Sequence, residues 1–217
     1  MKYQLVVFDM DGTILDTLGD LTDSINAVLS ENGLPGRTER EVRSYLGNGL
    51  RRLVELSLPD ATPAEVTDRV FLRMKDYYAS HCAIRTCPYD GILPLIRRLK
   101  ENGVKVAVVS NKIDEAVQEL CAGYFDNVFD YAIGERPGMR KKPAPDPVNA
   151  VLDALGFDRG QAVYVGDTEV DIQTAKNAGM DCIAVDWGFR DRAYLSTLGA
   201  EYMVSDPADI AGIVLGK

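Results

Sequence analysis

The sequence holds few of the residues on which several common kinds of site depend. Histidine occurs once in 217 residues, as His81, and the four cysteines show no CxxC spacing. Zinc sites and disulfide frameworks need closely spaced cysteines or histidines, so neither is expected, and reduced thiols favour a cytoplasmic location. A Ser-His-Asp hydrolase would depend on His81 alone, and no GxSxG motif accompanies it.

Long apolar runs and an excess of basic residues are also absent. No stretch approaches the roughly 18 apolar residues of a membrane helix, and the first apolar run meets Asp9 and Asp11 too early for a secretory signal. The 24 basic and 33 acidic side chains give a formal net charge of -9, which disfavours a nucleic-acid partner. We expect neither membrane nor nucleic acid as a partner, and the sequence indicates no particular oligomeric state.

Strand-like and helical patterns alternate over most of the chain. Apolar runs that end in polar or glycine residues lie at 3–8, 104–109, 128–133, 162–165 and 182–185. Helical periodicity lies between them, at 93–99, 113–121, 147–155 and 172–178. Strands buried on both faces and separated by helices are typical of a parallel sheet. The sequence therefore predicts an α/β fold with a doubly wound parallel sheet.

One segment departs from this alternation. Residues 17–81 contain no strand-like run but several amphipathic patterns, at 21–29, 50–56 and 64–78. We therefore expect a helical domain at 17–81, inserted after the first strand of a core formed by 1–16 and 82–217.

Two acidic residues follow the first predicted strand. Asp9 and Asp11 are two positions apart, so along an extended chain both carboxylates project to the same side, and Gly12 beside them lets a ligand approach the backbone. One carboxylate can then act as a nucleophile while the other transfers protons. Alternatively, these aspartates only cap a turn or a helix.

Two further acids follow the strand at 162–165. Asp167 and Asp171 reach the same sheet edge as Asp9 and Asp11, because ligands and polar residues gather at the carboxyl ends of parallel strands. Four carboxylates there repel one another unless a cation neutralises them, and Mg²⁺ is the expected one. Asp171 also fits a first-turn acid that a helix dipole favours, which is compatible with a supporting role.

Candidate anion-binding residues come from two other segments. Ser110 and Asn111 end a buried strand, where hydroxyl and amide can donate to an anion at the start of the next helix; helix capping is the alternative. Lys142 belongs to the basic run 140–142, which is ordinarily solvated. Pro143 and Pro145 stiffen its loop, which suits a lysine held in place to balance phosphate charge.

These segments together resemble a known family. DMDGTILD at 9–16, VVSNK at 108–112, KPAPDP at 142–147 and VGDTEVDIQTAKNAGM at 165–180 are similar to the four motifs of the haloacid dehalogenase superfamily, in order. The resemblance implies a Rossmann-like core, and the insert resembles the small helical cap of the subfamily that includes phosphoglycolate phosphatase. The implied roles are Asp9 as nucleophile, Asp11 as general acid/base, and Ser110 and Lys142 as phosphate binders. The resemblance also implies Asp167 as Mg²⁺ ligand with Asp9 and the Asp11 backbone carbonyl, supported by Asp171. We expect Gly12, Thr13 and Asn111 to contribute to phosphate binding as well.

The resemblance also narrows the activity. Dehalogenase members lack an aspartate at the position of Asp11 and need no Mg²⁺, whereas Gly47-Asn48-Gly49 before Arg51, and PYDGI at 88–92, are most similar to phosphoglycolate phosphatases. We expect a Mg²⁺-dependent phosphatase that forms an aspartyl-phosphate and acts on a small phosphorylated metabolite, first of all 2-phosphoglycolate. Arg51 is expected to bind the anionic end of the substrate, unless it is simply solvated.

Several other activities remain open at this point. A pyrophosphatase, a nucleotide or sugar phosphatase and a hexose-phosphate mutase share the same chemistry and motifs. From a different class, a receiver-type binding module also accepts phosphate on an aspartate in a doubly wound sheet. Such a module is smaller and has no helical insert, which this chain does have.

Overall fold

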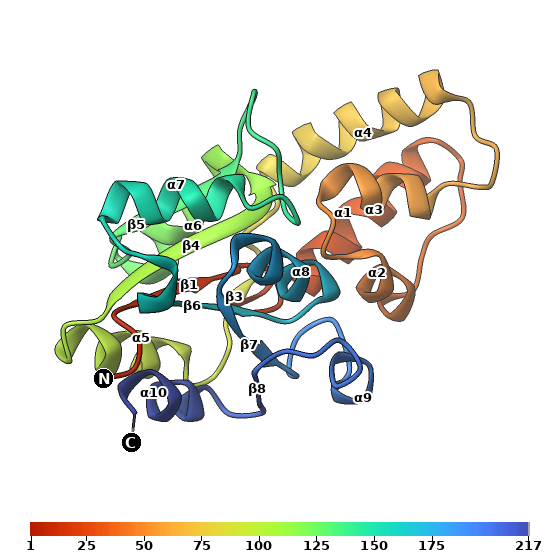
Figure 1. The fold of residues 1–217 in the computed structure, drawn as a ribbon. Coiled ribbons are helices and arrows are strands. Elements are labelled where there is room, and N and C mark those ends of the chain that lie inside the picture. The colour runs from red at the N-terminus through yellow and green to blue at the C-terminus, as the bar shows by residue number, and fades with distance from the viewer. Residues whose placement is uncertain (217) are drawn as a thin grey trace. The chain divides into compact units, whose positions relative to one another are not determined.

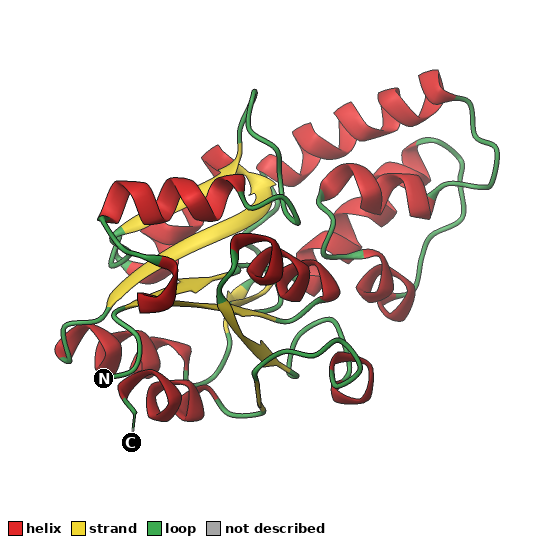
Figure 2. Cartoon of the chain, viewed as in Figure 1, coloured by secondary structure: helices red, strands yellow, loops and turns green. Residues whose placement is uncertain are grey.

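Figures 1 and 2 show a computed structural model of the chain, which describes residues 1–216. The chain forms two compact units. One combines Met1–Leu15 with the chain from Pro88 onward, and the other is Asp16–Cys87. The helical unit ends at residue 87 rather than at the predicted 81, because backbone amides at 84–86 donate to the side chain of Asp20 within the same unit.

The first unit contains a six-stranded parallel sheet, which confirms the predicted α/β fold. Its strand order is β5-β4-β1-β6-β7-β8. The strands are β1 (Leu5–Phe8), β4 (Lys105–Ile113), β5 (Tyr131–Glu135), β6 (Ala162–Gly166), β7 (Asp181–Val185) and β8 (Tyr202–Val204). Every residue of β1 is buried, and Val7 pairs with Ala107 on one side and Tyr164 on the other. The central position of β1 places the residues that follow it in the middle of the carboxyl edge.

Helices cover both faces of this sheet. They are α5 (Ile92–Glu101), α6 (Asp114–Phe125), α7 (Asp146–Leu155), α8 (Glu169–Ala178), α9 (Arg192–Leu195) and α10 (Pro207–Leu215), with a 3-10 helix at Arg159–Gln161. Buried Val148 of α7 and Ala175 of α8 pack with Leu5 and Tyr164 in one core cluster. Helices α5 and α10 contact each other on the opposite face of the sheet (Figure 1).

Three elements near the carboxyl end of the chain, α9, β8 and α10, were not predicted. Strand β8 has only three residues, too few for a recognisable pattern, and it pairs with β7 at the sheet edge. Helix α10 begins at a proline, and the Asp206 side chain caps it by accepting a hydrogen bond from Ala208 N at 2.8 Å. This Asp-Pro start is a recognisable signal in the sequence.

The second unit is helical. It contains α1 (Leu18–Glu31), α2 (Glu39–Tyr45), α3 (Leu50–Ser57) and α4 (Ala64–Ala79). Ile25, Leu53 and Met74 are fully buried. The chain passes between the units in two short strands, β2 (Leu15–Asp16) and β3 (Cys87–Pro88), which pair with each other. Among residues 1–216, no helix combines the length and the apolar character that crossing a membrane requires.

Candidate active site

Three carboxylates meet at the carboxyl edge of the sheet. Asp9 follows β1, Asp167 follows β6, and Asp171 lies in the first turn of α8. Each offers an oxygen within 4.8 Å of those of the other two. Asp9 is 5% exposed, and the other two are fully buried. This group, Asp9, Asp167 and Asp171, is called the carboxylate triad below.

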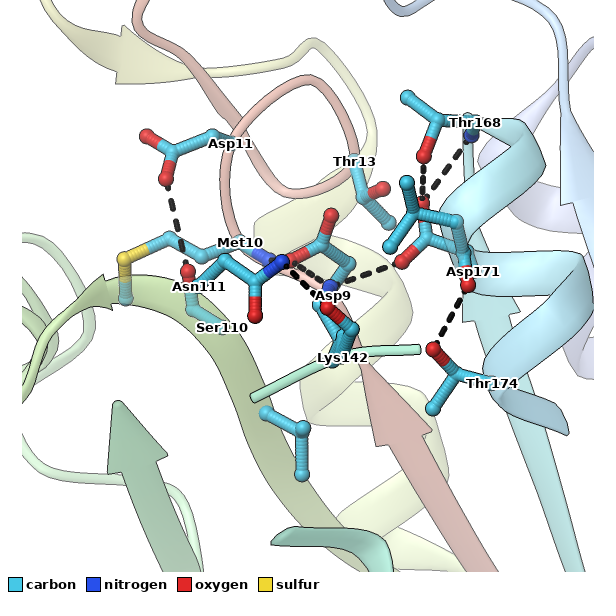
Figure 3. Close-up of polar contacts among 12 residues, drawn as sticks. Asp9, Met10, Asp11, Thr13, Ser110, Asn111, Lys142, Thr168, Asp171 and Thr174 are labelled. Atoms are coloured by element: carbon cyan, nitrogen blue, oxygen red, sulfur yellow. Dashed lines mark hydrogen bonds and ion pairs between the residues drawn. The ribbon is translucent and has the colours of Figure 1, made fainter. Parts of the chain in front are cut away.

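A buried lysine pairs with two members of the triad. Lys142 Nζ lies 2.7 Å from Asp9 Oδ1 and donates to Asp171 Oδ1 at 2.8 Å (Figure 3). It also donates to the Tyr164 hydroxyl at 3.1 Å. The loop that carries it is held by Asn111 Nδ2, which donates to Lys142 O at 3.1 Å. Lys142 is therefore a fixed positive charge beside Asp9, as the stiff loop predicts.

The triad carries more negative charge than Lys142 balances. Burial raises the pKa of Asp9 well above its usual range, and nearby Asp171 adds to the effect, while Lys142 opposes it. Burial, and then Asp171, raise the pKa of Asp167 to about 7. Burial alone lowers the pKa of Lys142, but the charges of Asp171 and Asp9 outweigh burial and raise it. Three clustered carboxylates with one cation suit a divalent metal ion, since hard cations prefer oxygen ligands.

The backbone closes tightly around Asp167. Phe189 N donates to Asp167 Oδ2 at 2.7 Å, and Thr13 Oγ1 donates to Oδ1 at 2.9 Å. Gly12 has φ +85°, and a Cβ there would lie 2.4 Å from Asp167 Oδ2; a Cβ at Gly188 would lie 2.3 Å from the same oxygen. The sequence predicts Gly12 and Thr13 as phosphate-binding residues, whereas in this structure both face the Asp167 carboxylate.

The Asp11 carboxylate is not part of the triad, and Figure 3 shows it apart from those of Asp9 and Asp171. The chain turns directly after Met10, whose carbonyl accepts hydrogen bonds from Ile14 N and Leu15 N, each at 3.0 Å. The extended backbone that would align Asp11 with Asp9 therefore ends at Met10. The expectation that both carboxylates project to one side is wrong for this reason, and the Asp11 carboxylate is not among the clustered metal-ligand candidates in residues 1–216.

Ser110 and Asn111 lie inside β4 rather than after it. The parallel ladder with β5 is irregular after Val109 but resumes where Ile113 pairs with Glu135, and α6 begins only at Asp114. The prediction that these residues stand at a helix N-terminus is therefore wrong. Ser110 Oγ instead donates to Asp11 Oδ2 at 3.5 Å, a long contact.

Asp171 serves two purposes at once. Its Oδ2 accepts hydrogen bonds from Thr168 N at 3.0 Å and Thr168 Oγ1 at 2.7 Å, which caps the first turn of α8. Its Oδ1 accepts the hydrogen bond from Lys142. The prediction of a helix-start acid is confirmed, and the same side chain also contacts Lys142.

Arg51 belongs to the helical unit. It lies in the first turn of α3, where its guanidinium is 3.2 Å from Glu55 Oε1 and 2.6 Å from Asp68 Oδ1. The side chain is 44% exposed and also stacks over the Phe71 ring. The sequence predicts an anion-binding arginine, and the structure gives this arginine two acidic neighbours of its own.

Some residues of the site were not predicted from the sequence. Tyr164 reads as a core residue of a strand, yet its hydroxyl lies among Lys142, Asp171 and Val109 O. Lys112 belongs to the VVSNK motif, but nothing in the spacing of the residues indicates that its ammonium meets Asp11 at 2.9 Å. Phe189 contributes only its backbone amide, which no side-chain pattern reveals.

Comparison with known proteins places the chain among hydrolases. Residues 6–185 match the haloacid dehalogenase-like hydrolase family. The phosphoglycolate phosphatase of Aquifex aeolicus is 32% identical over 216 residues, which span 97% of this chain and 96% of that protein. That of Neisseria meningitidis is 33% identical over 199 residues, or 89% of this chain and 84% of that protein.

A solved structure resembles the whole chain. It comes from Lactobacillus delbrueckii subsp. bulgaricus, is provisionally named a phosphoglycolate phosphatase, and is 40% identical with a TM-score of 0.95 over 100% of both chains.

Proposed function

The chain is an enzyme of the haloacid dehalogenase-like hydrolase family, and from this we propose that it cleaves phosphate monoesters through a covalent intermediate on Asp9. The observation that carries the proposal is the pairing of a buried carboxylate with a buried lysine inside the triad. Lys142 and Met10 N, each 2.7 Å from Asp9 Oδ1, fix the orientation of that carboxylate. A phosphoryl group that arrives at Asp9 meets a positive charge already in place.

The bonds that form and break are the following. A carboxylate oxygen of Asp9 attacks phosphorus while the bond from phosphorus to the ester oxygen breaks, and the leaving oxygen takes a proton from the Asp11 carboxyl group. Water then attacks phosphorus of the acyl phosphate and gives one proton to Asp11. This step releases inorganic phosphate and restores the Asp9 carboxylate, so both acids return to their starting states.

Mg²⁺ is the proposed cofactor. The carboxylates of Asp9 and Asp167 would hold it, with Asp171 orienting Lys142 and the start of α8 beside them. When bound, a Mg²⁺ ion offsets the charge of the carboxylates and of the phosphoryl oxygens. Phe189 N and Thr13 Oγ1 keep Asp167 in one orientation by their hydrogen bonds.

The proposed substrate is a small phosphorylated metabolite, and 2-phosphoglycolate is the first candidate. The support is the name of relatives that match almost the whole chain, including those of Aquifex aeolicus and Neisseria meningitidis. The roles of Ser110, Asn111 and Gly12 in binding phosphate, and of Arg51 in binding the carboxylate end, belong to this proposal.

Phosphate release from a panel of phosphorylated metabolites tests the proposal. With Mg²⁺ present, 2-phosphoglycolate is expected to give the highest kcat/KM, and excess chelator is expected to abolish release. Mg²⁺ also stabilises the folded protein if it binds only that state, by about 2.7 kcal/mol at 100 times its Kd. Full activity in chelator would overturn the metal assignment. Isomerisation of a sugar phosphate without phosphate release, or a phospho-protein that does not turn over, would overturn the phosphatase assignment.

A further inference from the structure

A second buried lysine serves the acid that lies apart from the triad. Lys112 Nζ lies 2.9 Å from Asp11 Oδ1, and its side chain is only 6% exposed, against 19% for Asp11. Lys112 lies in β4, one residue before its last, Ile113. Burial of an ammonium group is costly unless an acid faces it, so this pairing is a built feature of the site rather than a surface contact.

Ser110 completes the arrangement around Asp11. Its Oγ accepts a hydrogen bond from Lys112 N at 3.1 Å and donates to Asp11 Oδ2 at 3.5 Å. Each oxygen of the Asp11 carboxylate therefore has its own neighbour, the ammonium group at Oδ1 and the hydroxyl group at Oδ2. Both neighbours come from one strand, β4.

The two buried lysines divide the acids between them. Lys142 faces Asp9 and Asp171 of the triad, whereas Lys112 faces Asp11. Asp11 is only two residues from Asp9, so without a charged neighbour its carboxylate would be free to turn toward any cation held by the triad. Lys112 gives the Asp11 carboxylate a positive charge of its own, 2.9 Å from Oδ1.

We propose that Lys112 is a positioning residue that holds the Asp11 carboxylate apart from the triad, in the orientation from which it exchanges protons with the leaving group and with water. The inference rests on the proposed function, because it takes Asp11 as the proton donor. In this role no proton moves to or from Lys112. Its effect falls on the step that needs Asp11 in the right place.

The test compares two esters with different leaving groups. The alkyl ester is 2-phosphoglycolate, whose leaving oxygen needs a proton. The aryl ester is p-nitrophenyl phosphate, whose leaving group departs without one. The ratio kcat/KM reports the steps up to departure of that group. Lys112→Met is expected to lower kcat/KM for the alkyl ester on the order of 100-fold, the effect of misplacing a catalytic group, and to change it less than about threefold for the aryl ester.

Three variants make the result specific. Lys112→Arg keeps the positive charge and is expected to recover most of the alkyl-ester activity. Lys105→Met removes another lysine of β4, which lies 2.7 Å from Asp130 and is 50% exposed, and is expected to leave both esters unchanged. In an Asp11→Asn background, Lys112→Met is expected to cause no further loss, because the two residues act as a unit.

The outcomes separate this inference from the function on which it rests. Equal losses on both esters, or additive losses in the Asp11→Asn background, would overturn the positioning role. If circular dichroism shows that Lys112→Met does not fold, Lys112→Gln replaces it, and Lys112→Arg remains the variant that keeps the charge. If Asp9→Asn keeps wild-type activity, the proposed function has failed. If Asp9→Asn is inactive but Lys112→Met leaves kcat/KM unchanged for both esters, only the inference has failed.

Discussion

Asp9 in the α/β unit and Asp20 in the helical unit are both buried aspartates, but their surroundings differ. Asp20 is 2% exposed and accepts hydrogen bonds from three backbone amides, Ile84 N at 3.0 Å, Arg85 N at 2.8 Å and Thr86 N at 2.9 Å. Burial raises the pKa of Asp20, but the Thr86 hydroxyl and these amides outweigh burial and lower it. For Asp9, burial and the neighbouring acids win, and its pKa is raised.

The difference shows what each carboxylate is for. The donors around Asp20 stabilise its negative charge and lower its pKa, so the charge stabilises the fold. Around Asp9, other carboxylates share one lysine, and burial together with these acids raises the pKa of Asp9. A buried carboxylate whose pKa is raised in this way is characteristic of sites that bind or react. Substitution of each aspartate by asparagine is therefore expected to have opposite consequences.

Asp9→Asn is expected to cause the largest effect on activity. The substitution keeps the size of the side chain but removes the nucleophilic charge, so phosphate release should fall at least about 1,000-fold. In metal-free buffer the thermal midpoint should not fall, because the substitution removes a buried charge that lies close to two other carboxylates. The measurement is steady-state phosphate release beside thermal unfolding. More than a few per cent residual activity would contradict the nucleophile assignment.

Asp20→Asn is expected to reduce stability instead. Asparagine offers one acceptor oxygen where the carboxylate offers two, and it carries no charge, so the unfolding free energy should fall by about 2–3 kcal/mol. Hydrogen exchange at the amides of residues 84–86 should accelerate. Asp23→Asn is the matched control: it lies in the same helix, and its exposed ion pair with Arg85 at 3.0 Å should matter by less than about 0.5 kcal/mol. Equal effects of the two substitutions would contradict the comparison.

Acid should remove the contribution of Asp20 selectively. Because its pKa is lower in the folded protein than in the unfolded chain, ionised Asp20 stabilises the fold above the unfolded pKa. That contribution disappears as the pH falls through the folded pKa. Between about pH 5 and pH 2, urea unfolding should therefore show a steeper loss of stability for the wild type than for Asp20→Asn. Parallel curves would mean that the charge of Asp20 is not what stabilises residues 84–86.

Arg51→Ala is expected to have the smallest effect. Glu55 and Asp68 already occupy its guanidinium, so KM for 2-phosphoglycolate should rise only about two- to fivefold, with little change for an aryl phosphate. Arg52→Ala, whose partner is Glu55 at 3.2 Å, provides a neighbouring arginine as control. If both substrates respond equally to Arg51→Ala, this arginine does not bind the carboxylate end.

The gathering of Asp9, Asp167, Asp171 and Lys142 could be predicted from the sequence. Each acid follows a buried apolar run or opens the next helix, and parallel strands bring such positions to one edge. Lys142 was recognisable because prolines restrict its loop. Each of these signals lies in a short stretch of sequence. A parallel sheet then brings the marked residues close together, because the carboxyl ends of its strands lie at one edge.

The placement of Asp11, Ser110 and Lys112 could not be predicted. Strand β4 continues past Val109 because Ile113 pairs with Glu135 of β5. The residues around Ser110 do not by themselves indicate this pairing. The direction of Asp11 depends on the turn at the Met10 carbonyl. Asp20 was missed because its partners are backbone amides 64 to 66 residues away in the chain.

The double duty of Asp171 has a consequence for how the protein assembles. One of its oxygens caps α8 and the other accepts from Lys142, so the first turn of the helix and the lysine loop are energetically linked. Residues 9, 142 and 171 are far apart in the chain, and contacts of such long range form after much loop entropy has been lost. The site can therefore react only after folding is complete. In a chain whose α8 has not formed, Asp171 does not hold Lys142 beside Asp9.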